Sequence, residues 1–190
     1  MRIIIFAVTL ILTMSSICLG QSIADPCETL IPSELSKVIK TKYPKYRIAR
    51  TTDYSEKIIE EQKGNNPNHS CLAIASADVD GDGSLDYAFF LTNQTGRVLL
   101  LAARNLNGRS WHITKLSDFP KGEIGVSYVN AIEPGSYEDI YADDPDIKAE
   151  PGNILKFSST KPGFLAGTIE SSGIAYFFSG KRWIHLWLSD

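Results

Sequence analysis

The chain has 190 residues, and its 19 basic and 22 acidic side chains give a formal net charge of −3. This balance leaves no basic stripe of the kind that follows a phosphate backbone, which argues against a nucleic-acid partner. The length suits one domain that can bury a core without help from a metal ion.

Residues 1–20 have the pattern of an export signal. Residues 3–12 are apolar apart from one threonine, and small residues precede a cleavage site after Gly20. The apolar run is too short for a membrane span, which needs about 20 residues. Lipid attachment at Cys18 is the alternative, although the isoleucine before it is larger than the residue that such sites usually have. We predict cleavage, and a periplasmic or secreted protein in which residues 21–190 form a single domain.

Two cysteines, Cys27 and Cys71, remain after removal of the signal peptide. An even pair in an exported protein favours a disulfide between them, and two buried free thiols are the alternative. The bond would stabilise the fold by about 4 kcal/mol at most in the chain-entropy model. It would join the start of the mature chain to the first predicted strand.

Two amphipathic helices are predicted in the N-terminal third. Residues 32–43 carry apolar side chains at helical spacing with lysines turned outward, and Pro44 ends this pattern. Residues 55–63 form a shorter helix, opened by Ser55 and closed by Gly64.

From Cys71 onward the pattern changes to short apolar and aromatic runs that are typical of strands. Their short connections favour antiparallel neighbours. We predict an α+β fold with N-terminal helices packed on an antiparallel β-sheet, and a β-barrel-like sheet with a helical cap is the alternative. The predicted strands are 72–76, 87–91, 98–103, 111–116, 127–132, 154–157, 174–178 and 183–188.

An acidic loop, Asp78-Val-Asp-Gly-Asp-Gly-Ser-Leu-Asp86, places aspartates at positions 1, 3, 5 and 9. Carboxylates this close repel one another by about 1 kcal/mol per pair even in water, and a hard divalent cation removes that repulsion. Glycines between the aspartates permit the tight turns of a chain that wraps around an ion. A solvated acidic turn is the alternative, but it does not require this spacing. The predicted Ca²⁺ ligands are Asp78, Asp80, Asp82, Asp86 and the backbone carbonyl of Ser84.

The segment 77–88 resembles the calcium loop of FG-GAP/VCBS repeats, which form the propeller blades of integrin alpha subunits. All four aspartate positions match, so the resemblance implies Ca²⁺ bound by these residues. A propeller is not expected, because the loop occurs once. An EF-hand is not expected either, because Phe89 stands where its loop has a bidentate glutamate. The whole chain resembles small exported bacterial proteins that carry one such loop and an aromatic C-terminal hairpin.

Two further features leave alternatives open. The acidic segment 137–147 is either a solvated loop or a surface that binds a basic partner or a second cation. Trp111, Trp183 and Trp187 either belong to the core or form a platform that stacks on a carbohydrate, and the last two share one strand face.

These features predict function only at the level of class. We expect a calcium-stabilised binding or accessory protein without catalytic activity, which takes an unknown protein or glycan ligand. No membrane span and no cofactor other than Ca²⁺ are expected. One alternative is a calcium-stabilised hydrolase of envelope or secreted polymers, which would require a cleft with convergent carboxylates. The other is an inhibitor or immunity protein that blocks a partner enzyme.

Overall fold

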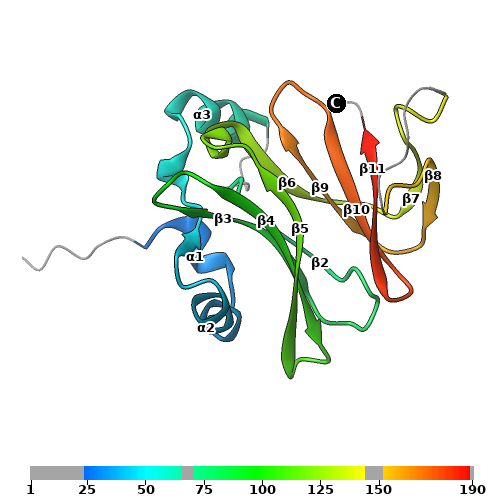
Figure 1. The fold of residues 1–190 in the computed structure, drawn as a ribbon, viewed down its shortest axis with the longest axis horizontal. Helices are drawn as coiled ribbons and strands as arrows, with labels where there is room; N and C mark the ends of the chain where they lie inside the picture. Colours follow the sequence, from blue (N-terminus) through cyan, green and yellow to red (C-terminus); the bar gives the residue numbers. More distant parts are fainter. Residues whose placement is uncertain (1–23, 66–70, 144–151, 189–190) are drawn as a thin grey trace, which may run out of the picture.

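The computed structural model describes residues 24–65, 71–143 and 152–188, so the predicted signal peptide lies outside the described residues. Three short helices precede most of the strands (Figure 1). The helices are α1 (Pro26–Leu30), α2 (Ser33–Lys42) and α3 (Glu56–Asn65). The strands are β1 (Tyr46–Ile48), β2 (Ile74–Ala77), β3 (Asp86–Asn93), β4 (Val98–Leu106), β5 (Ser110–Phe119), β6 (Ser127–Ile132), β7 (Gly135–Glu138), β8 (Lys156–Ser159), β9 (Gly163–Thr168), β10 (Gly173–Ser179) and β11 (Arg182–Leu188).

The first sheet has the strand order β1-β3-β4-β5, and β2 also pairs with β3. Because β4 occupies one edge of β3, β1 and β2 share the other edge end to end, opposite residues 91–93 and 86–89 respectively. Every residue of β4 from Val98 to Ala103 is buried. Such uninterrupted burial means that both faces of this strand are covered, which explains why its sequence is apolar without alternation.

The second sheet has the order β11-β10-β9-β6. One of its faces is covered by the β7–β8 hairpin, whose Tyr137 and Phe157 rings lie 5.0 and 5.3 Å from the ring of Phe177. The opposite face contributes Phe164 and Tyr176 to the larger core, which it shares with the first sheet. The second sheet is therefore buried on both sides over its central strands.

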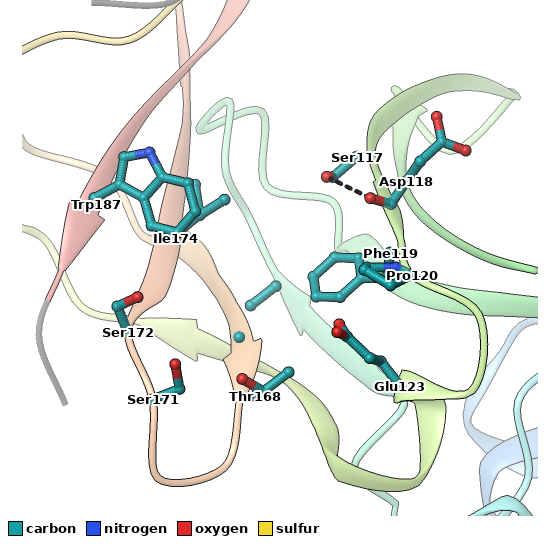
Figure 2. A pocket seen from close by; sticks show the side chains of 12 residues that line it. Ser117, Asp118, Phe119, Pro120, Glu123, Thr168, Ser171, Ser172, Ile174 and Trp187 are labelled. Carbon is teal, nitrogen blue, oxygen red and sulfur yellow. Dashed lines mark hydrogen bonds between the residues drawn. The ribbon is translucent and has the colours of Figure 1, made fainter. Parts of the chain in front are cut away.

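The two sheets contact each other along β2 and β6. The backbone N–H of Val129 donates to the carbonyl of Leu72 at 2.9 Å, which ties the second sheet to the segment just before β2. At another place between the two sheets, the end of β5 and the β9–β10 turn border a small pocket (Figure 2).

The predicted fold class is wrong, although the predicted helices 32–43 and 55–63 correspond to α2 and α3. The described chain is mostly antiparallel sheet, its short helices form no layer on a sheet face, and the sheets do not close into a barrel (Figure 1). The physical reason is the small apolar area of the helices. The first has 5 residues, and the second has 10 and buries only Leu35 and Ile39. Most of the burial therefore comes from strands.

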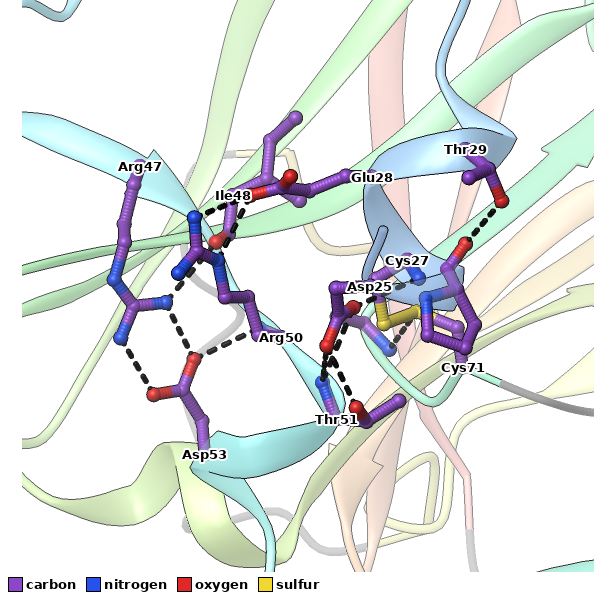
Figure 3. The surroundings of a disulfide bond; sticks show 12 residues. Asp25, Cys27, Glu28, Thr29, Arg47, Ile48, Arg50, Thr51, Asp53 and Cys71 are labelled. Atoms are coloured by element: carbon purple, nitrogen blue, oxygen red, sulfur yellow. Dashed lines mark hydrogen bonds and ion pairs between the residues drawn. A yellow bond between two sulfur atoms is a disulfide. The ribbon is translucent and has the colours of Figure 1, made fainter. Parts of the chain in front are cut away.

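The predicted disulfide between Cys27 and Cys71 is confirmed, with 5.2 Å between the Cα atoms (Figure 3). Both cysteines are buried, one in α1 and the other just before β2. Beside the bond, Asp25 caps α1 by accepting from the backbone N–H of Cys27 at 2.9 Å. The same carboxylate accepts from the hydroxyl of Thr51 at 2.6 Å. The N-terminal segment is thus tied to the strand that leads into the acidic loop.

Within the described ranges, no helix combines the length and the apolar character that a membrane crossing requires.

Candidate metal centre

The acidic loop connects β2 to β3 as the turn of an antiparallel hairpin, in which Ala77 lies opposite Asp86. Its backbone wraps around the side chain of Asp78, whose carboxylate accepts from the N–H groups of Gly81 at 2.7 Å and Gly83 at 3.0 Å. Gly81 has a φ of 75°, and a Cβ there would lie 2.8 Å from Cε of Lys161. Only glycine fits this position without movement of the neighbouring lysine.

Asp86 is the buried end of the loop, with no exposed surface. Its two carboxylate oxygens accept from the N–H of Val79 at 3.0 Å and from the N–H of Asn105 on β4 at 2.8 Å. Burial, with a smaller contribution from the negative charges of Asp80 and Asp82, raises the pKa of this carboxyl to about 6, against the lowering effect of the two backbone donors. A charged Asp86 is therefore costly unless a cation lies nearby.

Asp80 connects the loop to both sheets. One of its carboxylate oxygens pairs with Arg104 of β4 at 2.9 Å, and the guanidinium lies 3.8 Å from the ring centroid of Phe178 on β10. The backbone carbonyl of Asp80 accepts a hydrogen bond from Lys161. The other carboxylate oxygen, Oδ1, is buried and has no hydrogen-bond partner among the described residues. A buried oxygen without a partner is the kind of group that a metal ion satisfies.

Three of the predicted ligands converge. Asp78, Asp80 and Asp86 each offer one carboxylate oxygen within 4.8 Å of the other two, so together they can hold a metal ion. All three donors are hard oxygen atoms, which suit Ca²⁺ or Mg²⁺ better than a softer metal.

Asp82 is exposed, whereas Ser84 is half-buried. The carboxylate of Asp82 accepts from the N–H of Ser84 at 2.8 Å and from the N–H of Asn107 at 3.1 Å. These bonds lower the pKa of Asp82, the first of them most strongly. Asp82 is not one of the three converging carboxylates, so its part in metal binding, like that of the Ser84 carbonyl, stays a prediction.

The sequence analysis did not identify two basic side chains that contact the loop. Arg104 lies 24 positions and Lys161 lies 81 positions from Asp80. No local pattern marks either residue, because each reaches the loop only through sheet pairing and sheet packing. The one available signal for Arg104 is a charge that directly follows the apolar run of β4.

The acidic segment 137–147 and the three tryptophans each divide between different environments. In the acidic segment, Asp139 is buried and Asp143 is exposed, while the residues from 144 onward lie outside the described ranges. Of the tryptophans, Trp183 packs against core rings and Trp111 packs against Tyr87 at 5.7 Å. Trp187 lines the pocket between the sheets.

No family model matches the chain, and neither a curated protein nor a solved structure matches it. The resemblance of the loop to FG-GAP/VCBS repeats therefore stays a prediction based on the aspartate spacing.

Proposed function

We propose that this is an exported binding or accessory protein without catalytic activity, in which the loop from Asp78 to Asp86 holds one calcium ion. The convergence of Asp78, Asp80 and Asp86 carries this proposal. A catalytic metal keeps an open position for water or substrate and is usually held by residues from several segments. Here the candidate ligands all come from one turn, which suits a structural ion.

The position of the loop supports a stabilising role. Through Arg104 and Lys161 the loop contacts both β4 and the segment before β9. An ion that fixes the loop would therefore favour the docking of the second sheet on the first. Because the ion would bind only to the folded loop, it would raise the free energy of unfolding by mass action.

Location in the periplasm or outside the cell is part of the proposal. A buried disulfide suits an oxidising compartment. Extracellular calcium modules commonly bind the ion with dissociation constants of about 0.1–1 mM, and we expect an affinity in this range.

A calorimetric titration tests the proposal. The wild-type protein should bind one calcium ion, and a calcium concentration of ten to a hundred times the dissociation constant should add about 1–3 kcal/mol to the free energy of unfolding. Asp80→Asn should remove both effects, because it deletes the charge of a converging ligand. Asp143→Asn makes the same chemical change at an exposed aspartate and should leave both effects unchanged. If Asp80→Asn binds calcium as tightly as Asp143→Asn, the ion binds outside the loop. If neither variant nor the wild type binds calcium, the loop holds no calcium ion.

Proton competition gives a second prediction for the loop. Since burial raises the pKa of Asp86 to about 6, the ion-free protein carries a proton there below that pH. A cation must displace this proton, so calcium affinity should fall by up to about tenfold for each pH unit below 6. Titrations on either side of pH 6 measure the effect. Affinity that does not change across this range would mean that Asp86 is not a ligand.

A further inference from the structure

A pocket of about 220 Å³ lies between the two sheets, well away from the acidic loop in the sequence. Its floor and one wall are a row of side chains across three strands. Trp187 lies opposite Ile174, which lies opposite Ala166, and partners in register share one face of a sheet. The side chains shrink along this row from an indole to a methyl group. All three residues line the pocket, and Ala166 is fully buried at its base.

Hydrogen bonds and a ring contact hold the wall formed by Trp187 in place. The buried carboxylate of Asp139 accepts from the backbone N–H of Trp187 at 2.8 Å, and the N–H of Ile140 donates to the carbonyl of Trp187 at 2.9 Å. The ring of Tyr141 packs edge-on against the indole, with 6.4 Å between centroids. Backbone and ring are thus both fixed, so the indole is a preorganised surface.

The opposite wall combines an aromatic ring with a carboxylate. Figure 2 shows Phe119 and Glu123 across the pocket from Trp187, with the carboxylate of Glu123 directed toward the hollow. Asp118, by contrast, points away, and it pairs with Arg97 at 3.0 Å. Hydroxyl groups of Thr168, Ser171 and Ser172 line the lower rim in the same view.

We propose that this pocket binds one ring of a saccharide. The C–H face of a sugar ring is apolar and stacks on an aromatic surface, whereas its hydroxyl groups need donors and acceptors around the edge. The pocket supplies both kinds of group, with the indole and Phe119 on its walls and three hydroxyls and one carboxylate around them. Sites that enclose drug-sized ligands have volumes of about 300–1,000 Å³, and this pocket is smaller, so it suits a single ring. The inference rests on the proposed function, since it names the class of ligand that the binding protein takes.

The test is an NMR titration of the mature, disulfide-bonded protein with glucose, galactose and N-acetylglucosamine. At least one of these should shift the Trp187 indole N–H signal in a saturable way, with a dissociation constant in the millimolar range that is usual for so small a ligand. Sorbitol, an open-chain polyol, should not do so. Tetramethylammonium tests the competing view that Trp187 and Glu123 bind a cation. Saturable binding of that probe, with none of the sugars, would overturn the proposal.

Variants on the two walls locate the binding. Trp187→Ala should weaken sugar binding by about tenfold or more, and Trp111→Ala, which removes a partly buried indole outside the pocket, should not change it. Glu123→Gln should also weaken binding, by roughly tenfold, whereas Glu133→Gln at an exposed site should have no effect. Because Glu123 is only half-buried, its variant keeps the test valid if Trp187→Ala does not fold. Unchanged affinity in Glu123→Gln would overturn the proposal.

The titration is run with calcium and again with a chelator. Calcium binding without any sugar-induced shift would overturn the saccharide site and leave the calcium proposal standing. A sugar-induced shift in a protein that binds no calcium would overturn the calcium proposal and leave the saccharide site standing.

Discussion

Reduction of the Cys27–Cys71 disulfide is expected to lower the free energy of unfolding by about 4 kcal/mol at most. The bond spans 44 positions in the sequence, so its loss gives the unfolded chain much more conformational freedom. Both cysteines lie in the core, and one of them is in α1, a helix of 5 residues. A helix this short is unstable by itself and depends on its tertiary attachments.

The N-terminal segment also has polar attachments, which should limit the damage. Asp25 binds the backbone N–H and the hydroxyl of Thr51, and Glu28 pairs with Arg50 at 2.6 Å (Figure 3). We therefore expect the reduced protein to keep both sheets while its denaturation midpoint falls. Urea denaturation with and without a reductant measures the change. The Cys27→Ser/Cys71→Ser double variant is the control, and it should not respond to the reductant. An unchanged midpoint in the reduced wild type would mean that the disulfide adds nothing to stability.

The sequence predicted local features of the fold better than its architecture. The apolar run of β4 was visible because burial on both faces demands apolar residues at every position. The aromatic runs of β10 and β11 were visible because aromatic residues are enriched in strands. Strands β1, β7 and β9 were not predicted. β1 has 3 residues, β7 has 4 with an exposed alternation, and β9 contains two glycines. Such segments carry little propensity of their own and become strands only through their neighbours.

The functional residues show the same contrast between local features and features that depend on packing. The acidic loop is a local feature, because ligands from one turn leave a regular spacing in the sequence. Arg104 reaches the acidic loop from β4, and Glu123 and Trp187 meet at the pocket from distant segments. Neither arrangement leaves a regular spacing in the sequence. The sequence offered carbohydrate stacking for three tryptophans without a means of choosing among them. The structure distinguishes Trp187, because that residue alone among them lines a described pocket between the sheets.

Asp139→Ala should destabilise the protein by about 2–4 kcal/mol. Asp139 is 2% exposed, and its carboxylate accepts from the backbone N–H groups of Trp187 at 2.8 Å and Tyr141 at 2.9 Å. Its removal leaves two buried donors without a partner, at about 1–3 kcal/mol each, while the loss of a buried charge offsets part of that cost. Asp139→Asn keeps one acceptor oxygen, so its effect should be intermediate. Asp143→Ala, at an exposed site in the same acidic segment, should change stability by no more than about 0.5 kcal/mol.

The Asp139 series also tests how the pocket wall is held. If the carboxylate positions the indole, the Trp187 indole signal should move in both Asp139 variants even under conditions in which they remain folded, and sugar affinity should fall with it. Denaturation midpoints and the indole spectrum can be recorded on the same samples. Equal midpoints for Asp139→Ala and Asp143→Ala would show that the two backbone bonds contribute nothing. A lower midpoint with an unmoved indole signal would separate the two roles, because Asp139 would then stabilise β11 without positioning Trp187.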